Sequence, residues 1–417
     1  MREVTETEAS AGDRIRVKKE GLEYTGILMP SHRFSGQDVI TLKLDNGYNI
    51  GLRITSEDVI ELMEKGVSSK RDRGKVPAPD PGKPRISILA TGGTIASYVD
   101  YRTGAVHPAE TAGDLFHSNP ELVERCSPSV KVLFSKLSED IGPRDWVHIS
   151  DSVIEEFESG ADGVIIAHGT DTMGYTSAAL SFLLHDLPGP VVLVGSQRSS
   201  DRPSSDASLN LLAAVEVAKS DLSGVYVVMH ESLDDNRCSV HFGTKVRKMH
   251  TSRRDAFRSV NAEPLGWVDP LGGGIHVMGP PRRDTKPVRV GDMDEKVCML
   301  YVHPGMDSDL ISLEKDHHGM VLVATGLGHI HSDLIPAVRG VIEGGTPVVV
   351  TSQCIHGTVN LNVYSSGRML AETGVISGRD MLPETALVKL MWALSLDEEV
   401  NITMNENISG EFSGRRR

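Results

Sequence analysis

The chain has 417 residues, of which 39% are hydrophobic and 24% charged, and its formal net charge is −14. This length predicts two or three domains, and no run approaches the roughly 18–20 apolar residues that a membrane-spanning helix needs. The acidic balance argues against nucleic-acid binding over the whole surface, although it leaves room for a local basic patch.

The cysteines and the first residues of the chain indicate the cellular compartment in which the protein is expected. The 4 cysteines form no CxxC pair, so the sequence suggests neither a zinc site nor a disulfide framework. The first residues change from acidic to basic and hold no apolar core, so we expect no signal peptide. We therefore expect a cytoplasmic protein that binds no metal and no membrane.

Residues 1–66 predict a small β-rich domain. Short β-prone runs alternate with turns here, and Asn46-Gly47 is a strong hairpin signal. The expected strands are 13–17, 25–29, 39–44 and 48–54, followed by a helical or extended tail at 59–63. Such tight hairpins suggest a small β-barrel, which is either a recognition module or a packing appendage.

A linker at 67–84 separates this module from the rest of the chain. The segment is first basic and then rich in proline, and it holds almost no apolar residue. This composition is typical of an extended linker, so we place a domain boundary near residue 80.

From residue 85 the pattern alternates between strands and helices, which is typical of an α/β fold with a parallel sheet. We predict a larger domain at 85–278, a linker at 279–296, a smaller α/β domain at 297–400 and a solvated polar tail at 401–417. The strands expected after the one at residue 85 are 130–133, 163–167, 191–194, 224–229, 297–303, 319–325 and 347–351. The expected helices are 146–159, 175–184, 208–219 and 383–396.

Two of these strands run into threonine-rich turns. T-G-G-T occupies 91–94, and H-G-T-D-T-M occupies 168–173. Each turn taken alone is explained as well by helix capping, but the carboxyl ends of parallel strands can face one crevice. A threonine there can attack a carbonyl if a base takes its proton and N–H groups hold the oxyanion, and a lysine can serve as that base.

T-G-G-T-I-A at 91–96 and H-G-T-D-T-M at 168–173 resemble the two signature motifs of bacterial-type L-asparaginases. The resemblance covers roughly 85–400. It implies an asparaginase-like two-domain parallel-sheet α/β fold, here preceded by the small β-barrel-like domain.

The resemblance also implies a catalytic set. Thr94 is then the nucleophile, and Thr170, Asp171 and Lys248 activate it. Lys248 stands at the family's interval before the D-A-F segment, with Lys245 as the alternative.

Further residues are implied to hold the substrate. L-S-E-D at 137–140 stands where the family grips the substrate's α-amino and carboxylate groups, so Ser138 and Glu139 are candidates beside Gly93 and Gly169. A simple helix cap explains Ser138 and Glu139 nearly as well.

The loop after the first motif departs from the family. Free asparaginases have a tyrosine about where this chain has Ala105 and Val106, while Tyr98 and Tyr101 lie nearby but offset. We therefore expect the closure of this loop to differ.

Residues 1–84 precede the asparaginase-like part, and G-S-Q-R-S-S-D-R-P-S-S-D follows the next strand at 195–206. This arrangement resembles the D subunits of archaeal glutamyl-tRNA(Gln) amidotransferases. The resemblance implies a glutaminase-type protein without a cofactor of its own, which frees ammonia from L-glutamine or L-asparagine.

The same resemblance implies partners. The E subunit of such enzymes would use ATP and Mg²⁺ to convert Glu-tRNA(Gln) to Gln-tRNA(Gln), and it would make most of the contacts to tRNA(Gln). This chain would form a homodimer within a heterotetramer. Two alternatives stay open, a free-standing L-asparaginase or glutaminase and a non-catalytic binding scaffold.

Overall fold

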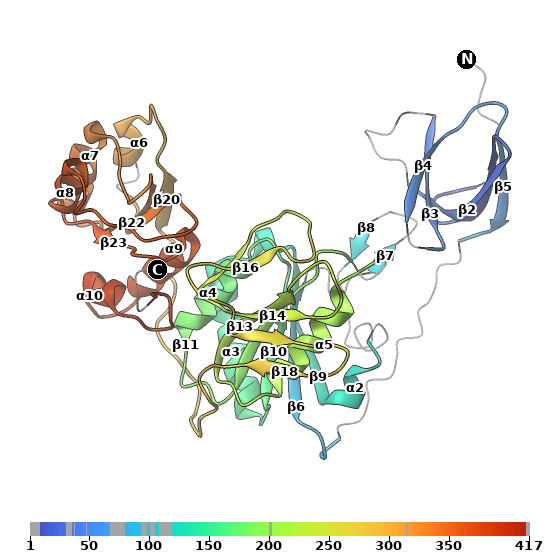
Figure 1. Ribbon diagram of the computed structural model, residues 1–417, viewed down its shortest axis with the longest axis horizontal. Coiled ribbons are helices and arrows are strands. Elements are labelled where there is room, and N and C mark those ends of the chain that lie inside the picture. Colours follow the sequence, from blue (N-terminus) through green and yellow to red (C-terminus); the bar gives the residue numbers. More distant parts are fainter. Residues whose placement is uncertain are drawn as a thin grey trace.

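The computed structural model describes residues 9–30, 36, 38–46, 48–66, 80–92, 98–100, 105–107, 119–199, 202–313 and 316–413. Figure 1 shows a central α/β domain with the N-terminal sheet near one side of its upper end and a smaller α/β domain near the other. No helix among these residues is long and apolar enough to cross a membrane.

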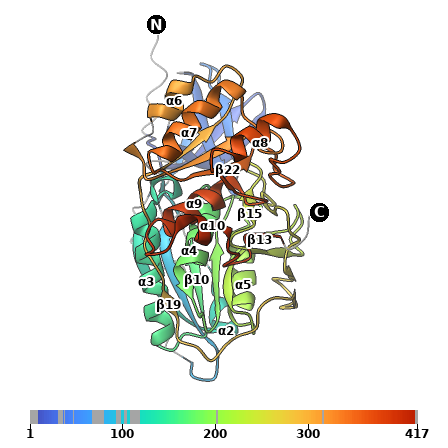
Figure 2. The same cartoon turned by 90° about the vertical axis from the view of Figure 1, so that its left-hand side faces the viewer.

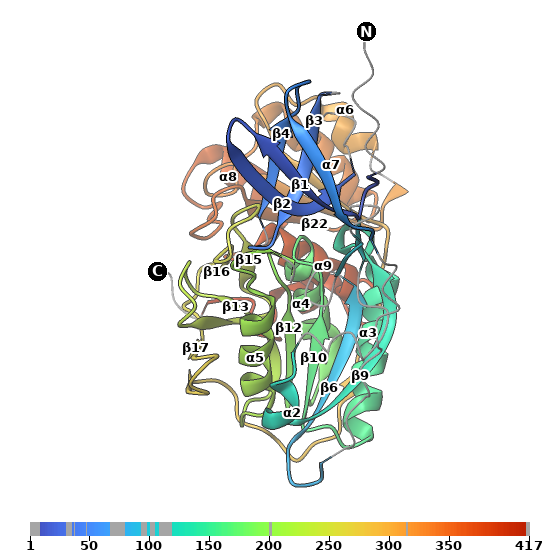
Figure 3. The same cartoon turned by 90° about the vertical axis from the view of Figure 1, so that its right-hand side faces the viewer.

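The N-terminal domain is one antiparallel sheet in the order β4-β3-β2-β1-β5, seen at the top of Figure 3. Its strands are β1 (Arg14–Lys19), β2 (Leu22–Met29), β3 (Val39–Leu44), β4 (Asn49–Arg53) and β5 (Val59–Glu64). Ile15, Val17 and Leu42 are fully buried because alternate residues of such strands face the core. The predicted β-rich module is thus confirmed, and the tail at 59–63 is a strand.

The central domain is built on an eight-stranded sheet in the order β18-β17-β14-β13-β12-β10-β6-β9. The strands β9, β6, β10, β12 and β13 are parallel, and β14, β17 and β18 extend the sheet antiparallel. The parallel strands are β6 (Arg85–Gly92), β9 (Ser127–Lys136), β10 (Gly163–Ala167), β12 (Pro190–Val194) and β13 (Gly224–His230). The antiparallel ones are β14 (Cys238–Phe242), β17 (Gly266–Val268) and β18 (Ile275–Val277).

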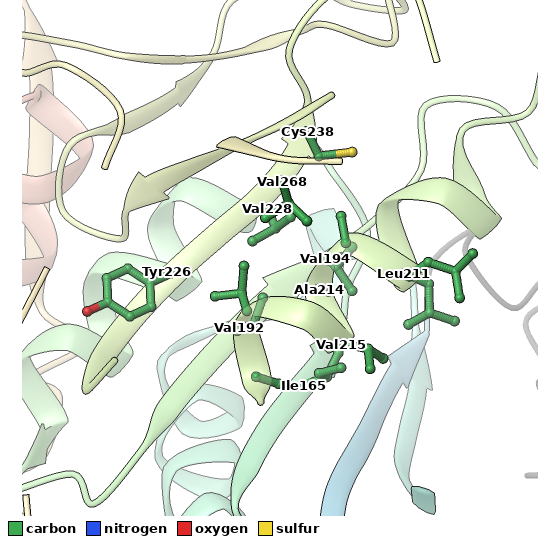
Figure 4. Packing of buried hydrophobic residues seen from close by; sticks show 14 of the residues in the cluster. Ile165, Val192, Val194, Leu211, Ala214, Val215, Tyr226, Val228, Cys238 and Val268 are labelled. Carbon is green, nitrogen blue, oxygen red and sulfur yellow. The ribbon is translucent and has the colours of Figure 1, made fainter. Parts of the chain in front are cut away.

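Helices cover both faces of this sheet, which is why its strands β10 and β12 are apolar at every position. Within β10, Ile165 packs on the side of α5, whereas Val164 and Ile166 pack on the side of α3 and α4. Figure 4 shows the first of these cores, where Val192 and Val194 meet α5. The helices are α2 (Leu122–Arg125), α3 (Pro143–Glu158), α4 (Met173–Leu183) and α5 (Ala207–Ala218).

Where the structure describes this domain, it also holds three two-stranded pairs. They are β7 (Tyr98–Asp100) with β8 (Ala105–His107), β15 (Val246–Lys248) with β16 (Phe257–Ser259), and β11 (Leu184–His185) with β19 (Val288–Arg289). The last strand lies within 279–296, so the expected linker contains a strand paired with the central domain.

The C-terminal domain is a four-stranded parallel sheet in the order β20-β21-β22-β23. Its strands are β20 (Val297–Tyr301), β21 (Gly319–Ala324), β22 (Val348–Ser352) and β23 (Ile376–Ser377). Its helices are α6 (Ser308–Leu313), α7 (Ile335–Glu343), α8 (Ser365–Ala371), α9 (Pro383–Ala393) and α10 (Val400–Asn405).

Helix α9 joins the two α/β domains into one packed body. It lies against α4 of the central domain, and the rings of Phe182 and Trp392 stack with centroids 5.7 Å apart. Figure 2 shows α9 and α10 over the central domain, below the C-terminal sheet. Val321 and Val349 of that sheet belong to the same buried cluster, so the two domains share a hydrophobic core.

The expectation that 401–417 is a solvated tail was wrong for its described part. α10 covers the start of this segment, and Glu411 and Phe412 are buried. The Glu411 carboxylate accepts from the backbone amides of Ile408 and Ser409 and pairs with the buried Lys389 at 2.6 Å. Polar residues can be buried where each charge and donor finds a partner, and composition alone does not reveal such partners.

Candidate active site

The first threonine-rich turn begins where β6 ends. The Thr91 hydroxyl donates to the carbonyl of Ala167 at 2.9 Å and so ties the end of β6 to the end of β10. Gly92 has a φ of 115°, and a Cβ there would stand 2.1 Å from the Lys136 carbonyl oxygen of β9. Only glycine fits at this position, because the backbones of β6 and β9 approach each other so closely. Gly93 and Thr94 lie outside the described residues.

The second turn is held from beneath by a buried histidine. His168 Nδ1 lies 2.6 Å from the Gly169 carbonyl, which can only accept, so we assign the proton to Nδ1. Nε2 then accepts from the Thr176 hydroxyl at 2.9 Å, and Thr176 in turn accepts from Trp146 Nε1 at 3.0 Å. Burial lowers the pKa of His168 to about 4, although its bond to Gly169 opposes the shift. His168 is therefore a neutral support of the turn.

Lys248 reaches this turn from the hairpin of β15 and β16. Its Nζ donates to Thr170 Oγ1 at 2.9 Å and to Asp171 Oδ1 at 2.8 Å. Thr170 is buried, whereas the Asp171 side chain is 66% exposed and that of Lys248 is 14% exposed. Three of the four residues expected to be catalytic are thus in contact.

Lys245, the alternative to Lys248, lies elsewhere. Its side chain is buried and pairs with Asp380 of the C-terminal domain at 2.8 Å. The geometry therefore favours Lys248 as the partner of Thr170 and Asp171.

Of the expected substrate-binding residues, Ser138 and Gly169 lie together. A Cβ on Gly169 would stand 2.9 Å from Ser138 Oγ, so glycine lets the two segments approach. The Thr172 hydroxyl donates to the Ser138 carbonyl at 2.5 Å and fixes the short helical turn Ser138–Asp140 against the second motif. Glu139 belongs to that turn and is exposed.

The expected position of the family's tyrosine falls in β8. Ala105 pairs with Asp100 and Val106 with Val99, so this segment is one arm of an antiparallel hairpin. Tyr98 lies in the other arm, opposite His107. Tyr101 lies outside the described residues.

The segment at 195–206 supports the site in a way that sequence reasoning missed. A Cβ on Gly195 would stand 2.9 Å from Thr170 Cγ2, so this glycine makes room for Thr170. Asp206 is buried and accepts from the backbone amides of Gln197 and Arg198, and Asn210 Nδ2 bridges Asp206 to the Gly195 carbonyl. The only signal in the sequence was an aspartate before a helix, which ordinarily indicates an N-cap.

This geometry defines what the site can do chemically. The hydroxyl of Thr170, the Lys248 amine and the Asp171 carboxylate form a continuous hydrogen-bonded path at the carboxyl ends of parallel strands. Such a path can move a proton to or from a nucleophile beside it. The turn also precedes the N-terminus of α4, whose free N–H groups favour polar or anionic groups.

The fold is that of the asparaginase class of amidohydrolases. Residues 85–282 match the family described as "Asparaginase, N-terminal", and 296–403 match "Glutaminase/Asparaginase C-terminal domain". Among solved structures, the thermostable L-asparaginase from Thermococcus kodakarensis is similar with a TM-score of 0.72 and 33% identity, over 79% of this chain and 100% of that one. A probable cytoplasmic L-asparaginase from Campylobacter jejuni is similar with a TM-score of 0.66 and 27% identity, over 78% of this chain and 100% of that one.

The N-terminal domain indicates which family within the asparaginase class the chain belongs to. Residues 9–63 match the family described as "GatD N-terminal domain". The D subunit of the glutamyl-tRNA(Gln) amidotransferase from Pyrococcus abyssi is 47% identical over 98% of this chain and 96% of its own length. The one from Methanobrevibacter smithii is 48% identical over 96% of this chain and 94% of its own. The chain belongs to the family of glutamyl-tRNA(Gln) amidotransferase D subunits.

Proposed function

We propose that this chain is the glutaminase component of its amidotransferase and that it uses Thr94 as the nucleophile. The observation that carries the proposal is the position of Lys248 Nζ, which lies within 2.9 Å of both Thr170 Oγ1 and Asp171 Oδ1. Thr170 and Asp171 follow β10, and β10 pairs directly with β6. β6 leads into Thr94, and Thr91 ties its end to β10, the strand that precedes Thr170.

In the proposed reaction, Thr94 Oγ attacks the carbon of the glutamine side-chain amide, and backbone N–H groups at Gly93 or Thr94 hold the oxyanion. Thr170, Lys248 and Asp171 take the hydroxyl proton and pass it to the departing nitrogen, which leaves as ammonia. Water then cleaves the acyl ester, which releases glutamate and restores the Thr94 hydroxyl. We assign Ser138 and Gly169 to the substrate's binding site, with Glu139 beside them.

We further propose that ammonia passes to the E subunit, where ATP and Mg²⁺ activate the glutamate of Glu-tRNA(Gln). The net charge of −14 supports a division of labour in which the E subunit makes most of the phosphate contacts to tRNA(Gln). Two copies of this chain and two of the E subunit would form a cytoplasmic heterotetramer.

The test uses the complex with the E subunit, ATP, Mg²⁺ and Glu-tRNA(Gln). Thr94→Ala should abolish amidation with glutamine and leave amidation with added ammonium intact. Loss of both reactions would show that Thr94 is needed for assembly, and retention of both would overturn the proposal. Thr285→Ala, the same substitution at a threonine of the segment between the two α/β domains, is the matched control and should keep both reactions.

A second candidate is a free-standing asparaginase, which the likeness to the L-asparaginase from Thermococcus kodakarensis favours. It predicts rapid asparagine hydrolysis by the isolated chain, unchanged when the E subunit and Glu-tRNA(Gln) are added. Strong stimulation of glutamine hydrolysis by these additions would instead support the proposed role as the glutaminase component of the amidotransferase.

A further inference from the structure

The strand that carries Lys248 is anchored by the C-terminal domain. β15 has three residues and pairs with β16 in a hairpin that is separate from the eight-stranded sheet. Val246 is buried in the core beneath the sheet, and Lys248 reaches Thr170. Because neighbouring residues of a strand point to opposite faces, Arg247 points the other way, toward the C-terminal domain.

The first anchor is a buried ion pair between the two domains. Lys245 Nζ lies 2.8 Å from Asp380 Oδ2, and the two side chains are 2% and 10% exposed. The backbone amide of Ser413 donates to both oxygens of Asp380, and the Ser413 hydroxyl donates to the Asn261 carbonyl at 2.5 Å. Burial alone would raise the pKa of Asp380, but the bonds from Lys245 and Ser413 lower it, so the carboxylate stays charged.

Two further anchors flank this pair. Arg247 Nε lies 3.2 Å from Glu384 Oε1 at the start of α9. The Thr385 hydroxyl donates to the Thr244 carbonyl at 2.9 Å, and the Thr244 hydroxyl donates to the Ser409 carbonyl at 3.0 Å. Contacts with the C-terminal domain thus hold the backbone and side chains immediately before Lys248.

We propose that Lys245 and Arg247 are positioning residues, through which the C-terminal domain sets the distance between Lys248 and Thr170. This inference rests on the proposed function, in which Lys248 belongs to the activating set. Neither residue touches the substrate in this account. A displacement of β15 of about 1 Å would suffice to impair proton transfer, because misplacements of that size can cost about 10²-fold in rate.

The test measures glutamine hydrolysis by the assembled amidotransferase. Lys245→Met should lower kcat by about 10- to 100-fold and leave KM within about threefold, because the site's binding residues are untouched. Asp380→Asn keeps the shape and an acceptor for Lys245, so it should retain much more activity than Lys245→Met. Unchanged kcat in Lys245→Met, or equal loss in kcat and in the fraction of folded protein, would overturn the inference.

Two controls separate positioning from stability. Val341→Ala opens a cavity in the C-terminal core, away from β15, and should keep kcat per folded molecule. Arg144→Ala removes a different pair, the one with Glu295, and should also keep kcat. If Lys245→Met does not fold, Arg247→Met takes its place, because Arg247 is partly exposed.

A last variant distinguishes the inference from the proposed function. If Lys248→Met keeps full glutamine hydrolysis, the proposed function fails. If Lys248→Met is inactive and Lys245→Met retains full kcat, the proposed function stands and the positioning role fails.

Discussion

Lys248 and Lys245 are three residues apart, yet they lie in opposite surroundings. Lys248 bonds to a carboxylate that is 66% exposed, and its other partner is a hydroxyl. Lys245 bonds to a carboxylate that is 10% exposed, inside the junction of two domains. Burying an ion pair costs much desolvation, and losing one of its partners is strongly destabilising, whereas an ion pair with an exposed carboxylate contributes little to stability. The interval before the D-A-F segment favoured Lys248 over Lys245 as the lysine of the site, and the burial of the two ion pairs supports the same choice.

The strongest test of this difference between the two lysines is to remove Lys248, the one at the candidate site. Lys248→Met should lower kcat for glutamine by about 10²–10⁴-fold, the usual contribution of a proton-transfer group. Its free energy of unfolding should change by less than about 1 kcal/mol, because the Asp171 partner is exposed. Steady-state kinetics and chemical denaturation of the same sample check both values. A large loss of stability would instead place Lys248 among the structural lysines.

A buried ion pair within the C-terminal domain predicts the reverse behaviour for Lys389, a loss of stability without a loss of activity. Lys389 and Glu411 are both 0% exposed and lie 2.6 Å apart. Lys389→Met leaves a buried, unpaired carboxylate and should lower the free energy of unfolding by about 3–5 kcal/mol. Activity per folded molecule should stay near that of the parent.

The matched control replaces both partners of this pair. Lys389→Met combined with Glu411→Leu removes both charges and should recover much of the lost stability. If the double variant were as unstable as the single one, the charge would not be the cause.

Much of the fold could be predicted because burial on both faces leaves a plain signature. β10 was expected at 163–167 and is found at Gly163–Ala167, and α9, expected at 383–396, covers Pro383–Ala393. The polar segment after residue 400 was misjudged because the partners of Glu411 are distant in sequence or depend on the local turn. The composition of a segment indicates whether its side chains prefer water, but it does not show whether buried polar groups find hydrogen-bond partners far away in the sequence.

In the candidate site, too, some residues could be found from the sequence and others could not. Thr170, Asp171 and Lys248 were found through motifs and a fixed interval, and the structure brings them into contact. Gly195 and Asp206 were missed as supports, because their role depends on the close approach of another strand end and on amides in an irregular turn. Thr94 stays a prediction.

A pH experiment tests whether the support beneath the site is neutral. Burial lowers the pKa of His168 to about 4, whereas an unfolded histidine titrates near its ordinary value of about 6.5. The unfolded state binds more protons between these values, so the stability contribution is full above pH 6.5 and falls as the pH drops toward 4. The shift corresponds to roughly 3 kcal/mol.

His168→Gln provides the comparison for that experiment. Denaturation curves at several pH values should show a shallower acid loss in the variant than in the parent protein. Some acid loss should remain in the variant, because burial also lowers the pKa of His241 to about 3. Identical slopes would mean that His168 is not held neutral by the fold.

The smallest effect is expected from the exposed pair between the central domain and the segment that leads into the C-terminal domain. Arg144 Nε lies 2.6 Å from Glu295 Oε1, but the Arg144 side chain is 89% exposed and that of Glu295 47%. In such surroundings water and salt screen the attraction, and ordering two long side chains offsets much of it. Arg144→Ala should therefore change the free energy of unfolding by no more than about 1 kcal/mol, as measured by denaturation at two salt concentrations. A loss comparable to that in Lys389→Met would mean that surface charge holds the domains together. A negligible loss would assign that task to the shared core around Phe182 and Trp392 and to the buried ion pair of Lys245 with Asp380.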